Sequence, residues 1–555
     1  MRSPLWHALR LAYQCDKKTF LIKMVYIVLL SILPLVNLYV IKYMIDGIAT
    51  TVGSGDNTIG HTLIVCVSIY CLVYMATRLI NVLNSVNNDI LTQKLIDYIN
   101  NIIQNQSVRL DMEYYDNPDY HDTFHRAQQE AAYRPIRIIE SFVTIMSAVV
   151  TLIGIFAMLC TTSWKIIVVM IVAMLPSFCV RLYKSRSIYK FRKETTQQMR
   201  RSQYYGQLLT NRTFAQEVRA FGLAGVFRTL YVSVRKTLVR MLLRISRRLA
   251  IYDALTALVE TAALFALILI LLKPVFAGIV TIGTFVMLFE ALRRGQHQMQ
   301  TLVSGVSGLY EHKLFIGNLN EFLALEPKIT SPSQPTPFPK EIECVEFSHI
   351  TFSYPPSNET LAQQAPVLQD FCFEAHKGSI AHLQGENGYG KSTALKLLLR
   401  LYDPQQGSIR INGTDIREFD LKELRCGISA IFQDPVRFYF TAKENIEFGS
   451  MQHANDHERM QRALDLSGAQ SVVNRLPDGV NTQLGRMFEH GEELSLGQWQ
   501  RLALARQLYG DAPILFFDEP TAWMDANTRI SFFRHLEQLK HDHVIILITH
   551  SENPD

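Results

Sequence analysis

Residues 385–392, GENGYGKS, place two glycines, a lysine and a serine at the spacing G-x-x-x-x-G-K-[ST]. The stretch follows an apolar run at 380–383 and precedes a helical pattern at 393–401, which is the context that this motif requires. The backbone N–H groups of such a loop cradle phosphate oxygens, aided by the N-terminus of the helix. We therefore expect Lys391 to reach the β- and γ-phosphates of a nucleotide and Ser392 to offer its hydroxyl to Mg²⁺.

A second stretch, ILFFDE at 514–519, supplies carboxylates. Four apolar residues in a row are typical of a buried parallel strand, and Asp518 then emerges at its end, where it can hold Mg²⁺ through water. Glu519 is placed to polarise an attacking water as a general base. A further apolar run at 544–549 brings His550 to the same edge, next to a γ-phosphate. A capped strand end and a surface histidine are the alternatives, and the upstream phosphate loop favours the functional interpretation.

A third stretch, LSLGQWQRLALAR at 494–506, has apolar residues at helical spacing. Ser495 stands where this helix begins, and Gly497 allows close approach of a backbone. A capped helix N-terminus carries partial positive charge and free N–H donors, so it suits an anion.

The segments around these motifs differ sharply between the two parts of the chain. The 555 residues are too many for one core, so we expect at least two domains. The overall composition is 48% hydrophobic and 19% charged, and the apolar excess lies before residue 310, in runs long enough to cross a bilayer. Residues 325–340 are rich in Pro and Ser and indicate a linker. After it, short apolar runs alternate with helices, as in a mixed α/β domain. The net charge of +5 does not favour a nucleic-acid partner.

Six membrane spans are predicted, with short links on one side of the bilayer and long, polar, helical connections on the other. We place the spans at about 19–44, 61–83, 140–161, 164–183, 249–272 and 279–300.

Charge sets the orientation of these spans. The link 48–60 has no Lys or Arg, whereas the connection 184–248 is full of both, and positive loops stay in the cytoplasm. Arg2, Arg10, Lys17 and Lys18 put the N-terminus inside as well. Residues 3–15 are predicted to form an amphipathic helix on the inner surface.

The long connections, 84–139 and 184–248, suggest helices that continue past the membrane and turn at their tips. The first tip, 112–126, contains the turn signal Asn117-Pro118-Asp119. The second tip, 212–224, ends near glycines. We expect both tips to dock on a cytoplasmic domain, and an ordinary cytosolic hairpin is the alternative.

Two acidic residues lie within predicted spans, where a charge is costly. Glu260 and Glu290 either line a polar substrate path or pair with Arg293, Arg294 or another helix. The eight cysteines show no CxxC and no Cys/His cluster at zinc spacing, so we interpret them as buried small apolar residues in a reducing or membrane setting.

Taken in order, these motifs resemble those of ATP-binding cassette (ABC) exporters of the six-helix half-transporter type, over the whole chain. The resemblance implies an α-helical membrane domain, with six transmembrane helices and long cytoplasmic extensions, followed by a P-loop α/β nucleotide-binding domain. Expected bounds are 1–320 for the membrane domain, 321–340 for the linker and 341–555 for the cassette, which is expected to be short at its C-terminal end.

The resemblance also assigns roles to individual residues. Gln433 matches the glutamine loop that senses Mg²⁺, Tyr354 the aromatic residue that stacks on adenine, and His550 the switch histidine. Leu494–Gln498 matches the signature usually written LSGGQ, with Leu496 where glycine is usual, and Trp523-Met524-Asp525 occupies the D-loop. The expected catalytic residues are Glu519, His550 and Gln433, and the expected Mg²⁺ ligands are Ser392, Gln433 and Asp518. The expected ATP contacts are Tyr354, Gly385, Asn387, Gly388, Gly390, Lys391, Ser392, Thr393, Ser495, Gly497, Gln498 and Asp525.

In this family the signature helix contacts the γ-phosphate of ATP held by the partner domain, so the resemblance implies a dimer that sandwiches two ATP molecules. We expect a second copy of this chain, or a related half-transporter, as partner. The expected function is ATP-driven export of a peptide or an amphipathic small molecule across the plasma (inner) membrane by a multi-pass protein, with the N-terminus and the cassette in the cytoplasm. An ATP-gated channel or regulator, a lipid flippase and an uptake transporter of the same architecture remain alternatives.

Overall fold

Long helices make up the first of two units in the computed structural model, which describes residues 4–54, 58–116, 134–160, 164–276, 280–355, 365–385, 390–520 and 526–549. The first unit contains Met1–Gln106 and Phe124–Ala324, and the second contains Ser107–Thr123 and Leu325–Asp555. The helices of the first unit are α1 (Pro4–Cys15), α2 (Lys17–Ser54), α3 (Thr58–Arg109), α6 (Arg134–Cys160), α7 (Trp164–Glu194), α8 (Thr196–Thr210), α9 (Arg212–Ala220), α10 (Ala224–Phe276) and α11 (Ile282–Leu323).

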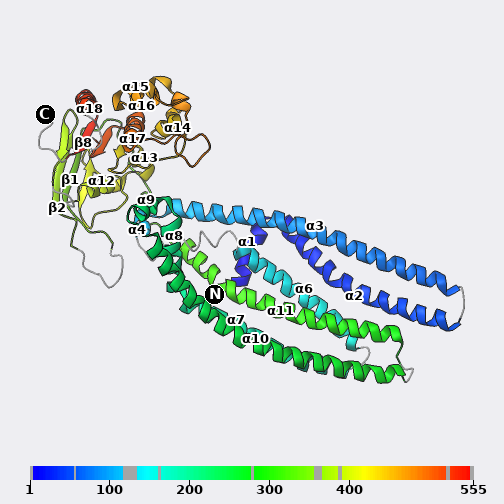
Figure 1. The fold of residues 1–555 in the computed structure, drawn as a ribbon. Coiled ribbons are helices and arrows are strands. Elements are labelled where there is room, and N and C mark those ends of the chain that lie inside the picture. Colours follow the sequence, from blue (N-terminus) through cyan, green and yellow to red (C-terminus); the bar gives the residue numbers. More distant parts are fainter. Residues whose placement is uncertain are drawn as a thin grey trace. The chain divides into compact units, whose positions relative to one another are not determined.

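Each of the six predicted spans falls mainly within one long helix of this unit, and α1 confirms the short helix predicted at the start of the chain. α10 has 53 residues, so it is about 80 Å long, far more than the ~30 Å of a bilayer core. Figure 1 shows α10 beside α7 over much of that length. The predicted cytoplasmic extensions are thus continuous with the spans.

Four helical segments are long and apolar enough to cross a membrane by length and composition, among the described residues: Lys17–Thr50, Leu63–Arg109, Ile136–Leu159 and Ala224–Ile270. They correspond to the first, second, third and fifth predicted spans. α11, which contains most of the sixth, carries Glu290, Arg293 and Arg294 along its length. The exact bounds of the spans stay a prediction.

The core of this unit combines large apolar side chains with glycines at the contact between α6 and α11. α2, α6 and α11 share a buried apolar cluster that includes Leu38, Ile155 and Leu288. A Cβ added to Gly305 would lie 2.7 Å from Ile145 Cγ1, and one added to Gly308 would lie 2.6 Å from Ser141 Oγ. Glycine therefore permits the close contact of α11 with α6, as small residues do at helix interfaces in membranes.

Large apolar side chains remain exposed on this unit, for example Leu72 and Leu258. Such a surface fits a lipid bilayer or a partner subunit. The cysteines correct one prediction, because none of those whose side chains are described is buried. Cys15, Cys66 and Cys344 are partly exposed, and Cys71, Cys179, Cys372 and Cys426 are exposed. Composition could not show that these thiols stand on the outer faces of helices and strands.

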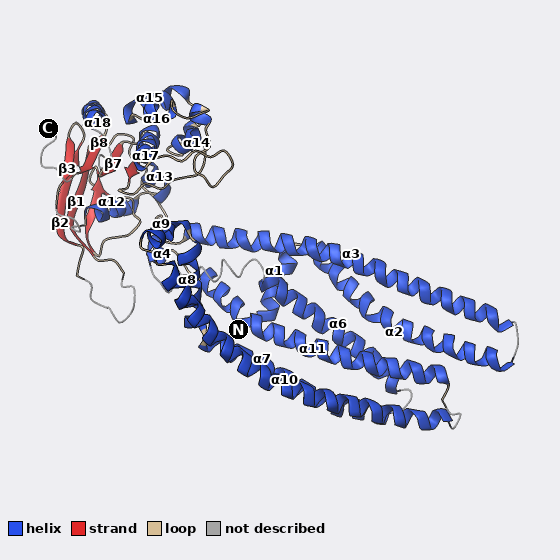
Figure 2. Ribbon diagram, in the orientation of Figure 1, coloured by secondary structure: helices blue, strands red, loops and turns tan. Residues whose placement is uncertain are grey.

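The second unit contains two four-stranded sheets (Figure 2). The antiparallel sheet has the order β2-β1-β4-β5 and the parallel sheet the order β3-β8-β7-β6. The strands are β1 (Cys344–Phe352), β2 (Leu368–His376), β3 (Ile380–Leu383), β4 (Gln406–Ile411), β5 (Thr414–Asp415), β6 (Ile428–Ile431), β7 (Ile514–Asp518) and β8 (Val544–Ile548). The helices are α4 (Met112–Asp116), α12 (Lys391–Leu398), α13 (Leu421–Cys426), α14 (Ala442–Glu447), α15 (His457–Ser467), α16 (Gln470–Val473), α17 (Leu496–Gly510) and α18 (Ala526–Leu539).

Every residue of β7 and β8 is buried, as their unbroken apolar sequences predict for central parallel strands. One apolar cluster joins the two sheets around α12, and another packs α18 on the parallel sheet. A third cluster joins α14, α15 and α17. The parallel strands thus form a rigid layer whose carboxyl ends can carry functional groups.

Part of the first predicted docking tip belongs to the second unit. Lys328 Nζ lies 2.8 Å from Glu113 Oε1 of α4, and the hydrogen bond to Glu113 raises the pKa of Lys328. Asp111 Oδ2 accepts hydrogen bonds from the backbone N–H groups of Lys328 and Ile329. The described end of this tip therefore docks on the linker that leads into the cassette.

Tyr402 adds a contact from the cassette itself. Its hydroxyl donates to Asp116 Oδ2, and burial together with this bond raises the pKa of Tyr402. The turn signal Asn117-Pro118-Asp119 lies outside the described residues. At the second tip, α9 begins after Asn211, whose side chain accepts from the backbone N–H of Thr213. Docking of the second tip stays a prediction.

Candidate nucleotide site and membrane cavity

The carboxyl ends of neighbouring parallel strands bring the predicted catalytic residues together. Gln433 lies just after β6. Asp518 is the last residue of β7, the strand paired with β6, and Glu519 follows it. Gln433 Nε2 donates to Glu519 Oε2 at 3.1 Å. Residues 86 apart in the sequence thus meet at one edge of the sheet. His550, predicted at the end of β8, lies outside the described residues, as does Asp525 of the D-loop.

Glu519 has an unusual backbone conformation for a residue with a side chain. Its φ is +49°, in the left-handed region. Its N–H donates to Ile548 O at 3.2 Å, and its carbonyl accepts from Gln500 Nε2 at 3.4 Å. Such a conformation costs free energy and persists where surrounding contacts fix it, often at functional sites. The strand end therefore holds this carboxylate in a fixed place.

Asp518 precedes Glu519 and is only 2% exposed. Desolvation of a carboxylate is costly without compensating interactions, so a position this deep is suited to a group that binds a cation. The adjacent amide of Gln433 adds a carbonyl oxygen to the same edge. The geometry at these strand ends is compatible with the predicted Mg²⁺ and general-base roles.

The phosphate loop is described at its two ends, Gly385 and Gly390–Thr393, and Asn387 and Gly388 lie outside the described residues. Gly390 caps α12 with φ +80°, and a Cβ there would lie 2.6 Å from Leu368 Cδ2. Only glycine fits this turn without displacing β2. Lys391 Nζ donates to Gly385 O, so the described start and end of the predicted phosphate loop are in contact.

Tyr354 contacts α12, the helix that follows this loop. Its hydroxyl and the Thr393 hydroxyl are 3.0 Å apart, and its ring makes edge contacts with Phe352 and Tyr402 at centroid distances of 5.0 and 5.4 Å. Lys396 Nζ lies 5.1 Å from the ring centroid, a cation–π distance. The tyrosine predicted to stack on adenine thus stands beside the helix that follows the phosphate loop.

The predicted signature helix begins as the sequence indicated. Ser495 is the N-cap of α17, its hydroxyl accepts from the Gln498 N–H, and the Gln498 side chain accepts from the Ser495 N–H, forming a capping box. Leu494 and Trp499 anchor this end in the cluster formed by α14, α15 and α17, whereas Leu395 and Tyr402, near Lys391, belong to the cluster between the sheets. One chain therefore keeps its phosphate loop and its signature helix on separate packing clusters.

Two buried glutamines that carry no motif, Gln500 and Gln507, tie α17 to β6 and β7. Gln507 Nε2 donates to Ser429 O of β6 at 2.9 Å and to Phe516 O of β7 at 3.0 Å. Gln500 reaches the Glu519 carbonyl, as described above. Their signal in the sequence is the presence of polar residues at inward-facing helical positions, which pattern matching alone passes over.

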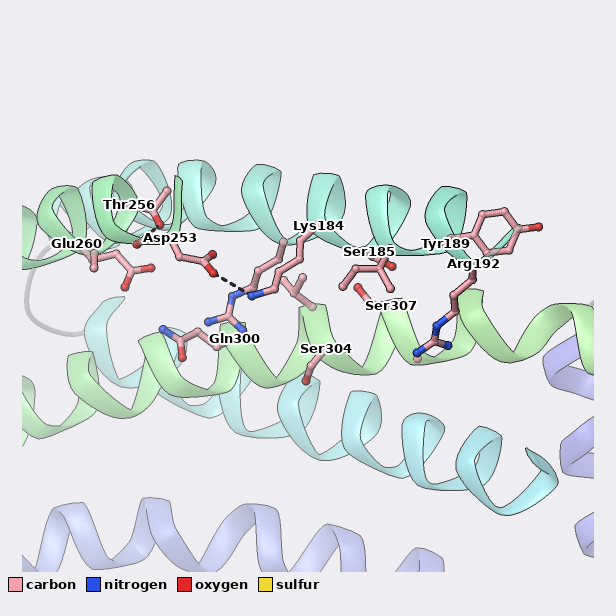
Figure 3. A pocket seen from close by; sticks show the side chains of 15 residues that line it. Lys184, Ser185, Tyr189, Arg192, Asp253, Thr256, Glu260, Gln300, Ser304 and Ser307 are labelled. Carbon is pink, nitrogen blue, oxygen red and sulfur yellow. Dashed lines mark hydrogen bonds and ion pairs between the residues drawn. The ribbon is translucent and has the colours of Figure 1, made fainter. Parts of the chain in front are cut away.

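A cavity of about 520 Å³ lies among α7, α10 and α11 in the first unit (Figure 3). Lys184 Nζ and Asp253 Oδ2 form an ion pair at 2.8 Å on its wall. Glu260, Gln300 and Arg192 also line it. Glu260 therefore lines a cavity that also carries charged groups, whereas Glu290 pairs with Arg293 and Arg294 at 2.8 and 3.1 Å, the alternative considered for it.

Comparisons with known proteins agree on one family. A family model described as ABC transporter matches residues 368–522. The subtilin transport ATP-binding protein SpaT of Bacillus subtilis is 26% identical over 98% of this chain and 86% of its own length. The nisin transport ATP-binding protein NisT of Lactococcus lactis subsp. lactis is 25% identical over 98% of this chain and 89% of its own length. The solved structure of a bacterial Atm1-family ABC exporter with ATP bound has a TM-score of 0.74 and 20% identity over 95% of this chain and 91% of its own.

Proposed function

This chain belongs to the ABC transporter family, as a membrane domain fused to an ATP-hydrolysing cassette, and from that premise we propose that it exports a peptide as a homodimer. Hydrolysis of ATP by the cassette supplies the free energy. The membrane domain converts it into alternate opening to the two sides of the bilayer. The membrane concerned is the plasma (inner) membrane, with the cassette in the cytoplasm.

The observation that carries the proposal is the meeting of Gln433 with Glu519 at adjoining strand ends. A general base must lie within hydrogen-bond reach of the water that it activates. In the proposed role, Glu519 takes the proton from the attacking water while the Gln433 amide orients that water. Because Gln433 begins the segment after β6, a change at the γ-phosphate can also move that segment.

The donor set at this edge fits Mg²⁺. Ser392, Gln433 and Asp518 offer oxygen atoms, the ligand type that this hard cation prefers. When bound, Mg²⁺ neutralises charge on the β- and γ-phosphates. Lys391 adds a positive charge from the phosphate loop, and Tyr354 and Lys396 flank the place proposed for the base of ATP.

A second copy of the chain would complete each ATP site. The N-terminus of α17 has the free N–H donors and partial positive charge suited to a γ-phosphate. Gln500 and Gln507 fix this helix against β6 and β7, so one helix tip and one catalytic edge move as a unit. ATP would then bind the closed pair better than the open one, which is the differential affinity that a conformational switch needs.

The cargo assignment rests on the membrane cavity and on the relatives. Two relatives that align with nearly the whole chain are named for transport of subtilin and of nisin. The cavity offers both charges, through Lys184 and Asp253, and hydrogen-bonding groups on three helices. Its volume lies within the usual ~300–1,000 Å³ of ligand pockets, so it can hold a short part of a longer peptide rather than all of it.

Reconstituted protein tests the proposal. A set of cationic, anionic and zwitterionic amphipathic peptides is added to proteoliposomes while ATP hydrolysis is measured, and uptake of the stimulating peptide is followed in inside-out vesicles. We expect ATP-dependent accumulation inside those vesicles. ATP-dependent ion current without accumulation would indicate a channel or regulator, movement in the opposite direction an uptake transporter, and transfer of labelled lipid alone a flippase; each would overturn peptide export.

A further inference from the structure

The outer face of β2 carries metal-binding side chains at alternate positions. Asp370, Cys372, Glu374 and His376 are all exposed, whereas Ala375 on the opposite face is buried. Successive side chains of a strand point to opposite faces, so these four lie in one row. The row, together with Cys344 and His349 of β1, is called the outer strip below.

β1 completes the outer strip through its pairing with β2. Cys344 lies directly across from His376 in the antiparallel register, at the spacing where side chains of neighbouring strands touch. His349 sits where the register shifts between Phe347 and Ile350, and its φ is +51°. Residues of β1 and β2 that are far apart in the sequence thereby form two groups of three donors.

In each group the donor atoms all lie within 4.8 Å of one another. In the first group, Glu374 Oε1 is 3.4 Å from Cys344 Sγ and 3.1 Å from His376 Nε2. In the second group, His349 Nδ1 is 2.6 Å from Asp370 Oδ1, and Cys372 Sγ accepts from the His349 backbone N–H at 3.3 Å. Cys344 is the less exposed of the two thiols.

The separations in the first group are close to those between the ligands of a tetrahedral zinc ion, whereas the 2.6 Å between His349 and Asp370 in the second group is shorter. Bonds of about 2.0–2.3 Å to N, O and S at tetrahedral angles put neighbouring ligand atoms roughly 3.3–3.8 Å apart. A thiolate, an imidazole and a carboxylate are the three ligand types that zinc uses in proteins. Three protein ligands leave a fourth position for water.

The ordinary explanation of such a strip accounts for only part of it. β2 is at the end of its sheet, and charged side chains on an edge strand discourage pairing with another chain. That purpose accounts for Asp370 and Glu374. It does not account for one exposed thiol, one partly exposed thiol and two imidazoles placed beside those carboxylates.

We propose that Cys344, Glu374 and His376 form a Zn²⁺ site that clamps β1 to β2, with His349, Asp370 and Cys372 as a weaker site of the same type. The first site is the stronger because two of its ligands, Cys344 and His376, are directly paired across the strands and its thiol is partly shielded. The clamp holds the edge of the sheet from which β1 leads to Tyr354.

The test uses the full-length chain in lipid nanodiscs with a phosphine reductant. The starting variant is Cys372→Ser, which removes the thiol of the weaker site. Zn²⁺ affinity is measured by competition with a chromophoric chelator, and Co²⁺ is used as a spectroscopic probe, because a cobalt–thiolate bond gives a near-ultraviolet charge-transfer band. We expect one tight Zn²⁺ site and that band in the starting variant.

Adding Cys344→Ser should remove the band, and adding His376→Ala should weaken Zn²⁺ binding at least tenfold. Adding Cys426→Ser, an exposed thiol elsewhere in the cassette, should change neither. Zn²⁺ should also raise the melting temperature of the starting variant but not that of the variant lacking Cys344. A band or an affinity that survives Cys344→Ser would overturn the proposal, provided that the variant keeps its zinc-free ATPase rate, which shows that it folds.

Discussion

The edge proposed to hydrolyse ATP in the second unit and the cavity of the first unit both gather polar side chains, but they do so in different ways. At the edge, a 2%-exposed Asp518 and a backbone-fixed Glu519 meet Gln433 at the ends of paired strands. In the cavity, Lys184 and Asp253 form an ion pair whose side chains are 45% and 43% exposed. Chemistry at a phosphate needs fixed geometry, whereas recognition of a peptide tolerates mobile, hydrated contacts. Changes at the edge should therefore alter the rate of hydrolysis, and changes in the cavity only its response to cargo.

The largest effect is expected for Glu519→Gln. Loss of the general base should lower the ATP hydrolysis rate by roughly 10²–10⁴-fold, because the amide cannot take a proton from water. ATP affinity should stay within about twofold, since the substitution is isosteric. Steady-state hydrolysis and nucleotide binding by calorimetry measure both; an unchanged hydrolysis rate would contradict the assignment of the base.

Lys391→Ala should act on nucleotide binding instead. Removing a charged hydrogen-bond donor to phosphate costs about 1.5–3 kcal/mol, so ATP affinity should fall by roughly one to two orders of magnitude. Lys396→Ala, five residues on, removes a cation that lies over the Tyr354 ring and should have a smaller effect. Equal losses for the two variants would contradict the special role of the loop lysine.

Asp253→Asn tests the cavity of the first unit, because it removes the charge that pairs with Lys184. Exposed ion pairs contribute about 0.2–1 kcal/mol, so the fold should survive and basal ATP hydrolysis should be unchanged. The peptide concentration that gives half-maximal stimulation should shift severalfold. The matched control is Glu194→Gln, which breaks the Lys190–Glu194 ion pair. This pair lies on α7, the helix that carries Lys184, but neither residue lines the cavity. A shift of equal size in the control would remove the cavity from cargo binding.

The smallest effect is expected for Tyr402→Phe, which removes the hydrogen bond to Asp116 at the docked tip. The lost bond joins a neutral hydroxyl to a carboxylate, and its loss falls on the contact between α4 and the cassette. The amount of peptide moved per ATP should fall modestly while uncoupled ATP hydrolysis is retained. Tyr439→Phe is the control, and equal coupling in both variants would show that the tip contact is dispensable.

The local positions of the predicted site residues in the cassette were largely predictable because these residues belong to short linear motifs. Lys391, Asp518 and Ser495 each sit where a strand–loop–helix pattern places them, and the apolar runs of β7 and β8 gave their burial directly. Gln433 and Glu519 could be assigned to one site only through family resemblance. The order of strands in a sheet cannot be derived from the sequence near each strand. Gln500 and Gln507 escaped notice, since a buried glutamine leaves no motif.

In the first unit, the positions of the helices could be predicted from the sequence, but the residues that line the cavity could not. The positions of α2, α6 and α10 follow from apolar runs, whereas the facing of Lys184 toward Asp253 depends on how α7 and α10 pack. The interpretation of the cysteines as buried was wrong for Cys344 and Cys372 because strand register, which no composition reveals, sets which face a thiol occupies.

The central claim is that the N-terminus of α17 from one chain completes the ATP site of another. A structure of the ATP-loaded Glu519→Gln protein in nanodiscs, determined by electron cryomicroscopy, tests it most directly. We expect two chains with two ATP molecules between them, each γ-phosphate within hydrogen-bond distance of Ser495 from the opposite chain. Nucleotides bound with Ser495 of their own chain, or out of contact with a second chain, would contradict it.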